Sequence, residues 1–127
     1  MDVDRLNQVT GEIVDAAMAV HTALGPGLLE SAYESCLLYE LHSRGLQAES
    51  QLALPIHYRD VSIDAGYRID LLVAGEVAVE IKAVDEVHPV HKAQIISYLK
   101  LSNNRVGLLI NFNVTRLKDG ITRFANN

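Results

Sequence analysis

The chain has 127 residues, of which 49% are hydrophobic, and its formal net charge is −5 at pH 7. The length suits one domain over residues 1–127 with its own hydrophobic core, and the composition excludes an intrinsically disordered chain. The acidic balance argues against a protein that coats nucleic acid non-specifically, because such binding depends on many basic side chains.

Two helices are predicted in the first third of the chain. Apolar residues recur at three- and four-residue steps from about Asp4 to Leu24, which is the period of an amphipathic helix. Gly25-Pro26-Gly27 breaks this pattern. A second helix is predicted from about Leu29 to Ser43, with Gly45 as its C-terminal stop. The positions it is expected to bury are Tyr33, Leu37, Leu38 and Leu41.

A strand and a hairpin are predicted next. Residues from about Ala48 to Tyr58 have the composition of a strand, in which Pro55 indicates an edge or a bulge. The segment YRIDLLVAGEVAVEIK, from Tyr67 to Lys82, alternates apolar and polar residues on both sides of Gly75. This alternation predicts two antiparallel strands joined by a short loop.

The last part of the chain alternates between helix and strand. Pro89 opens a predicted helix from about Val90 to Leu101, expected to bury Ala93, Ile96 and Leu99. The apolar run from Val106 to Phe112 predicts a central strand, and residues 121–124 a short final one. This order of elements predicts an α/β or α+β sandwich in which helices flank the sheet.

The hairpin carries the strongest chemical signal. A three-residue loop of Ala74, Gly75 and Glu76 would place Asp70 directly opposite Glu80. Opposed side chains on paired strands have Cβ atoms roughly 5 Å apart, and like charges there are destabilising unless a cation lies between them. Lys82 follows on the same face, and two acids with a lysine suit phosphodiester hydrolysis. The alternative is an ordinary solvated hairpin face.

Two helical faces supply further candidates. Glu30 lies in the first turn of the second helix, where it either complements the helix dipole or adds a third carboxylate to the site. Tyr33 shares its face and is either a core residue or a ligand. On the third helix His91, Gln94 and Tyr98 share a face. Gln94 and Tyr98 could orient a nucleotide or hold Lys82, or they are partly exposed helix positions.

Charge and cysteine content bear on partners and location. Residues 100–127 carry five basic residues against one acidic residue, which could form a basic edge beside the acidic site or simply be surface charge. No apolar run approaches the ~20 residues that a membrane span needs, and the polar N-terminus does not resemble a secretory signal. The single Cys36 cannot form an internal disulfide, and its apolar neighbours predict a buried side chain. We therefore expect a cytoplasmic protein without membrane contact.

Several motifs together resemble a known family. Gly27-Leu28-Leu29-Glu30-Ser31-Ala32-Tyr33 matches the G-x-x-E-x-x-Y signature of the small GxxExxY proteins, members of the PD-(D/E)XK nuclease superfamily. The segments YRIDLLV, VAVEIKAV, HKAQIISYLK and GLLINF follow in the order found in that family. Ile69 stands where the superfamily motif often has proline.

This resemblance implies a fold and a set of roles. The fold would be a three-layer α/β/α restriction-endonuclease-like core with a mixed β-sheet, and the cofactor Mg²⁺ or Mn²⁺. Asp70 and Glu80, helped by the Ile81 carbonyl, would bind the metal, and Glu30 would complete its surroundings. Lys82 would be the motif lysine. The Q-x-x-x-Y pair, Gln94 and Tyr98, would support the lysine or the substrate.

The function expected on these grounds is Mg²⁺-dependent hydrolysis of DNA or RNA by Asp70, Glu80, Lys82 and Glu30, with Gln94, Tyr98 and Tyr33 binding substrate. One alternative is a non-catalytic module that keeps the nuclease fold to bind nucleic acid or protein. Another is an assembly subunit, a homodimer in which an apolar strand edge pairs two copies of the chain.

Overall fold

The computed structural model describes residues 2–126. Its helices are α1 (Val3–Leu24), α2 (Glu30–Ser43), α3 (Pro89–Ser102) and the short 3₁₀ helix η1 (Leu117–Gly120). Its strands are β1 (Ala48–Ala53), β2 (Ile56–Tyr58), β3 (Val61–Ile63), β4 (Arg68–Val73), β5 (Val77–Lys82), β6 (Val106–Asn111) and β7 (Ile121–Ala125). No helix within residues 2–126 is long and apolar enough to cross a bilayer.

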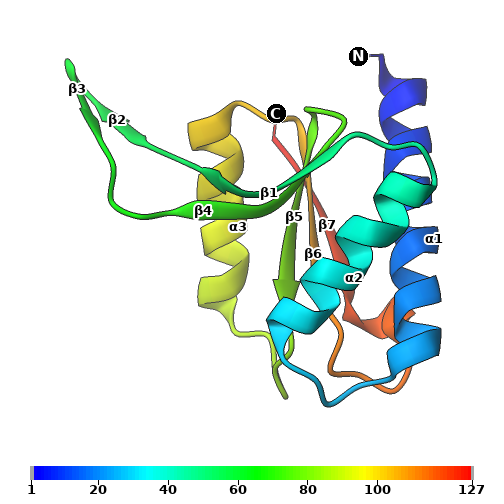
Figure 1. Cartoon of the computed structure of the whole chain (residues 1–127). Coiled ribbons are helices and arrows are strands. Elements are labelled where there is room, and N and C mark those ends of the chain that lie inside the picture. The colour runs from blue at the N-terminus through cyan, green and yellow to red at the C-terminus, as the bar shows by residue number, and fades with distance from the viewer. Residues whose placement is uncertain (1, 127) are drawn as a thin grey trace.

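The elements form three layers around a mixed sheet. Five strands pair in the order β1-β4-β5-β6-β7, with β5 and β6 parallel and the other neighbours antiparallel. Helices α1 and α2 cover one face of this sheet and α3 covers the other (Figure 1). The arrangement is the α/β/α fold with a mixed sheet that the sequence predicted.

The register of the β4–β5 hairpin is the one expected from its loop. Leu71 pairs with Val79 and Val73 with Val77, so the connection has three residues centred on Gly75. Ala74 and Gly75 both adopt left-handed backbone conformations, which lets the chain reverse within so short a loop. The paired register ends at Leu71 and Val79, so Asp70 and Glu80 are the next residues of the two strands beyond it.

The crossover helix α3 makes β5 an interior strand. It connects β5 to the parallel strand β6, which is buried at every position. The first five residues of β5 are buried as well, so neither face of that strand is solvated. The solvated hairpin face offered as an alternative from the sequence is therefore wrong for β5.

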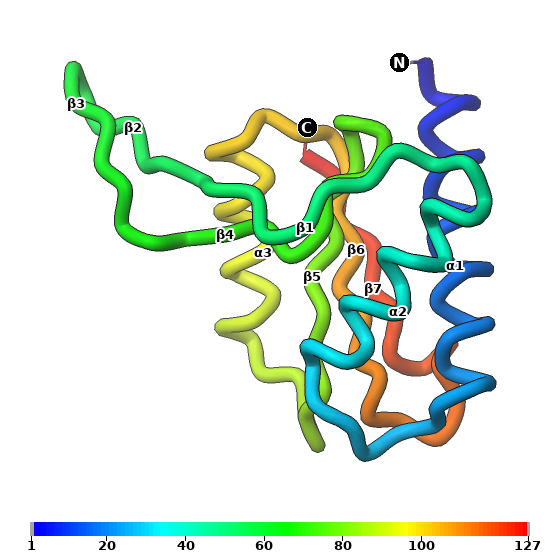
Figure 2. Tube along the Cα trace, in the orientation of Figure 1, coloured from blue at the N-terminus to red at the C-terminus, as the bar shows by residue number. Residues whose placement is uncertain are grey.

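The segment from residue 48 to residue 58 is two strands rather than one. Strand β1 ends at Ala53, before Leu54-Pro55, and β2 then pairs with β3 in a separate two-stranded ribbon. The ribbon extends away from the three-layer body (Figure 2). Strand β3 was not predicted because it has only three residues, all of them exposed.

Helix α3 buries a different face from the one predicted. Helix α3 buries Ile95, Tyr98 and Leu99, whereas Ala93 and Ile96 are exposed, contrary to expectation. Ile95 lies against Gly107 of β6, where a side chain would already touch it. Ile95 shares one helix face with Tyr98 and Leu99 at i+3 and i+4, and the absence of a side chain at Gly107 leaves room for it.

The first two helices fit their predictions more closely. Helix α2 buries Tyr33, Leu37 and Leu41, with Leu38 partly buried beside them. Cys36 is exposed, contrary to the prediction, because it lies one position before Leu37 and therefore off the buried stripe.

Two glycines offer a matched test of this packing. A Cβ at Gly120 would collide with the backbone carbonyl of Asn111, whereas a Cβ at the helical Gly11 would meet open space. We expect Gly120→Ala to lower the free energy of unfolding by roughly 1–3 kcal/mol. Gly11→Ala should raise it by about 0.5–1 kcal/mol. Urea unfolding measures both, and an equal effect of the two substitutions would contradict the packing described.

Candidate active site

Two carboxylates face each other across the β4–β5 hairpin. Asp70 Oδ2 accepts a hydrogen bond from the Ile81 backbone N–H at 2.8 Å. The Asp70 backbone N–H in turn donates to Glu80 Oε1 at 3.4 Å. Each acid is thus held by the backbone of the opposite strand. The hairpin register therefore fixes the carboxylates as well as the strands.

Burial makes this acidic pair unusual. Glu80 is 5% exposed, and its pKa is raised from 4.5 to about 9. Desolvation is the largest cause and the neighbouring charge of Asp70 the next, while the charge of Lys82 partly offsets them. At neutral pH the Glu80 carboxyl is protonated unless a further positive charge compensates Asp70.

Lys82 supplies the cationic group of this site. It is the last residue of β5, is half-buried, and pairs in register with Asn111 of β6. Its carbonyl accepts a hydrogen bond from the Phe112 N–H at 2.8 Å, which joins the end of β5 to the residue that follows β6. The lysine therefore projects from a fixed backbone position two residues after Glu80.

Glu34 and Gln51 also belong to this site, although the sequence did not single them out. Gln51 Nε2 donates to Glu34 Oε1 at 2.8 Å and lies 3.4 Å from Asp70 Oδ1. The pKa of Glu34 is raised, chiefly by burial and then by the charge of Asp70. The available signal was the spacing of Glu34 four residues after Glu30, which places two acids on one face of α2.

Gln51 occupies a strained position within β1. Its φ of 53° is left-handed, an uncommon conformation for a residue other than glycine. Residues held in such conformations cost of order 1–3 kcal/mol and concentrate at functional sites. Gln51 links α2 to Asp70 from this position, which marks it as a residue that orients the aspartate.

Glu30 reaches the end of β5 but not the carboxylate pair. Its Oε1 accepts a hydrogen bond from the Ala83 N–H at 3.3 Å, directly after Lys82. Across residues 2–126, no group of three or more His, Cys, Asp or Glu side chains is arranged to hold a metal ion. The expected triad of Glu30, Asp70 and Glu80 is therefore not assembled around one point.

The Q-x-x-x-Y pair of α3 lies beside Glu80. Gln94 Nε2 donates to the Tyr98 hydroxyl at 2.9 Å, and Tyr98 is 6% exposed. The pKa of Tyr98 is raised, first by burial and then by the charge of Glu80. This effect places the phenol within electrostatic range of the acids. His91, on the same face, accepts at Nδ1 from the His88 N–H and so caps the helix.

Tyr33 requires a correction. It is fully buried, its ring stacks on Phe112 with centroids 4.5 Å apart, and its hydroxyl donates to the Gly25 carbonyl at 2.6 Å. The hydroxyl also accepts from the Leu28 N–H at 3.1 Å. Tyr33 therefore fixes the loop between α1 and α2 and has no surface with which to bind substrate.

The structural role of Tyr33 can be measured directly. Tyr33→Phe keeps the stacked ring but leaves the Gly25 carbonyl and the Leu28 N–H without their partner. We expect the free energy of unfolding to fall by about 1–3 kcal/mol. Tyr39→Phe, at a position 76% exposed on the same helix, should change it little. Equal stability of Tyr33→Phe and the wild type would contradict the role assigned.

The raised pKa of Glu80 predicts a pH-dependent stability. The folded value of about 9 exceeds the ordinary 4.5, so the folded chain binds the proton more tightly. The stabilisation is complete below pH 4.5 and is lost as pH rises towards 9. In chelator, Glu80→Gln should therefore gain Tm relative to wild type between pH 5 and pH 9, by roughly 3–8 °C at the upper end. Calorimetry with the exposed Glu49→Gln as control checks this, and a constant difference would contradict it.

Comparison with known proteins agrees with the fold and the hairpin. The family model of the PD-(D/E)XK nuclease superfamily matches residues 7–124, nearly the whole chain. Searches of curated proteins and of solved structures gave no significant match. The matched region includes the sheet, the flanking helices and the acid–acid–lysine set of the hairpin. This chain belongs to the PD-(D/E)XK nuclease superfamily.

Proposed function

We propose that this chain is a nuclease of the GxxExxY type that uses Mg²⁺ or Mn²⁺ to hydrolyse phosphodiester bonds in DNA or RNA. The observation that carries the proposal is the buried Glu80 carboxyl held opposite Asp70, with Lys82 two residues further on. A buried carboxyl beside a second acid is costly to a fold, and membership of a nuclease superfamily supports a catalytic reason for keeping it.

The donor atoms at this site fit a hard divalent cation. Carboxylate oxygens are the ligands that Mg²⁺ and Mn²⁺ prefer, and nucleases of this superfamily generally use divalent metals. Asp70 and Glu80 would hold the ion, with the Ile81 carbonyl as a backbone donor and Glu30 supporting it from the end of β5. When bound, the metal supplies Lewis-acid polarisation of a phosphate oxygen and of a water molecule.

The protein side chains have separable tasks in this scheme. Asp70 is fixed by the Ile81 N–H and by Gln51, so its oxygens need little rearrangement to bind. Lys82 places a positive charge where negative charge builds up on the phosphate, and it orients the attacking water. The Gln94–Tyr98 pair supports the substrate from α3.

The basic residues of the chain bear on how a substrate would be held. The basic residues after position 100 would attract the phosphate backbone despite the net charge of −5. A binding module without turnover would bind nucleic acid equally well in chelator, which separates it from the enzyme. Pairing of two copies remains a prediction, which sedimentation of the purified chain tests.

Lys82→Ala tests the assigned chemistry. We expect cleavage of a mixed panel of DNA and RNA to fall at least about 100-fold, because a preorganised charge at the phosphate is lost. Calorimetric titration should still detect Mg²⁺ or Mn²⁺ binding, which Asp70→Asn and Glu80→Gln should abolish. Lys100→Ala, an exposed lysine on α3, serves as the matched control.

Each result of this experiment has a distinct meaning. Cleavage by Lys82→Ala at the wild-type rate would overturn the role of the lysine. Nucleic-acid binding that is unchanged in chelator, with no cleavage by the wild type, would replace the nuclease with the binding module.

A further inference from the structure

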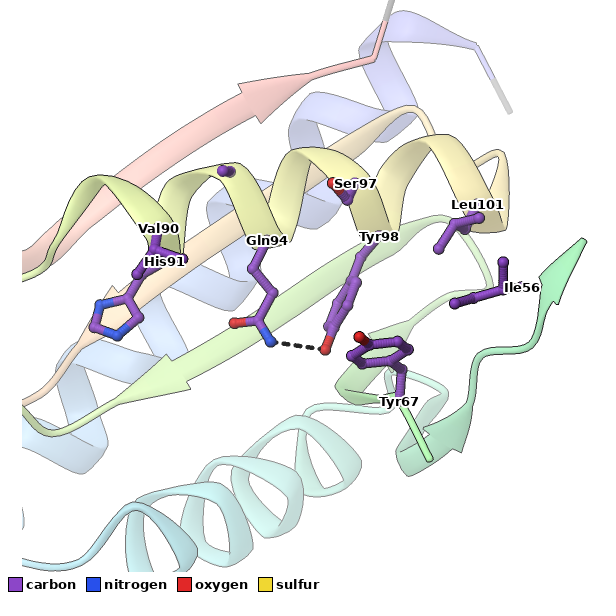
Figure 3. A pocket seen from close by; sticks show the side chains of 9 residues that line it. Ile56, Tyr67, Val90, His91, Gln94, Ser97, Tyr98 and Leu101 are labelled. Carbon is purple, nitrogen blue, oxygen red and sulfur yellow. Dashed lines mark hydrogen bonds between the residues drawn. The ribbon is translucent and has the colours of Figure 1, made fainter. Parts of the chain in front are cut away.

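A pocket of about 450 Å³ opens between α3 and the base of the β2–β3 ribbon. This volume is within the range of about 300–1,000 Å³ typical of small-molecule sites. Figure 3 shows the side chains from α3 on one side and those of Ile56 in β2 and of Tyr67, directly before β4, on the other. The residues that line it are Ile56, Tyr67, Val90, His91, Ala93, Gln94, Ser97, Tyr98 and Leu101.

The pocket lies beside the acid pair of the β4–β5 hairpin. Tyr98 and Gln94 line it, and Tyr98 is also the α3 residue whose pKa responds to Glu80 and Asp70. Tyr67 comes three residues before Asp70, which is roughly 10 Å along an extended chain. Its carbonyl accepts a hydrogen bond from the Leu54 N–H at 2.9 Å, so the backbone beneath the ring is fixed.

The pocket combines a flat aromatic surface with polar groups at one side. The Tyr67 and Tyr98 rings lie 5.9 Å apart and are tilted by 60°, and Tyr67 is 41% exposed, so much of its ring is open. The Gln94 amide N–H already donates to Tyr98, which leaves Gln94 Oε1 as an acceptor and the Tyr98 O–H as a donor. The remaining walls include Ile56, Val90 and Leu101, which are apolar.

We propose that this pocket binds an unpaired nucleobase of the substrate strand, stacked on Tyr67 and hydrogen-bonded at its edge by Gln94 and Tyr98. The proposal rests on the nuclease function proposed above and names the substrate class, a single-stranded segment. An aromatic platform accepts any base, because every base has a flat π face. A base within a duplex is already stacked and paired, and it would have to flip out to enter such a pocket.

Charge around the site favours the same substrate. The chain carries 16 acidic residues against 11 lysines and arginines, which is a weak basis for gripping two phosphate backbones at once. Base stacking provides affinity that does not depend on net positive charge. A single strand that inserts one base beside the acid pair would bring the adjoining phosphate towards Lys82 and the carboxylates.

The test combines binding with cleavage. Binding is measured by fluorescence anisotropy in Mg²⁺ on the Lys82→Ala chain, with a labelled ten-nucleotide single strand and with an abasic strand of the same length. Tyr67→Ala should weaken binding of the normal strand roughly 5- to 100-fold and leave the abasic strand unaffected. Tyr67→Phe should bind as the parent does, and Tyr39→Ala is the control for loss of an exposed tyrosine elsewhere. Ser97→Trp, which fills the pocket from an exposed helix position, should repeat the loss.

The cleavage arm compares a single strand with a blunt duplex of the same sequence, using the chain with its lysine intact. A preference for the single strand that Tyr67→Ala removes supports the proposal. Equal cleavage of both substrates, with no effect of Tyr67→Ala, overturns it while the nuclease function stands. Tyr67-dependent binding of bases without any cleavage would uphold the pocket and refute the nuclease. Thymidine monophosphate that competes as tightly as the strand would overturn the assignment to a strand in favour of a free nucleotide.

Discussion

The burial of Glu80 beside Asp70 is the constraint around which this site is organised. Two acids on facing strand positions would normally separate or be solvated, yet each is hydrogen-bonded to the backbone of the other's strand. Neither can move without breaking the hairpin register. The energetic cost of this arrangement is seen in the raised pKa of Glu80. The ionised carboxylate is unfavourable there unless a positive charge lies nearby.

The topology of the sheet explains why this cost is imposed. Strand β5 is antiparallel to β4 and parallel to β6, so it has a neighbour on each side. Helices α1 and α2 cover one face of the sheet and α3 the other (Figure 1), and the charge of Glu80 acts on Tyr98 of α3. Glu34 and Gln51 then approach Asp70 from α2 and β1. Four elements thus converge on one acid pair.

Local patterns sufficed for much of this structure. The length of the loop around Gly75 predicted the hairpin register, and Asp70 and Glu80 lie directly beyond its last pair and share hydrogen bonds across the two strands. The three main helices were recognised from periodicity, proline and glycine. Strand alternation could not show that β5 would be covered on both faces, because that burial depends on how α1, α2 and α3 pack on the two faces of the sheet (Figure 1).

The remaining errors concern contacts that a motif or a local pattern does not show. Tyr33 was assigned to substrate although its hydroxyl binds a loop eight residues away, which a motif does not reveal. Ile95 and Ile96 are chemically alike, but Ile95 shares a helix face with Tyr98 and Leu99 and lies against Gly107. Gln51 joins the site through a left-handed backbone turn within a strand, which no propensity would assign to glutamine.

The β2–β3 ribbon has a consequence for motion. Its two strands have three residues each, and five of these six residues are exposed, so the ribbon has no core of its own. Isolated two-stranded ribbons are marginally stable, and segments of this kind open at free energies well below that of global unfolding. The ribbon can therefore bend about Pro55 while the sheet stays intact. Ile56 moves with it, so one wall of the pocket is adjustable while the acid pair stays rigid.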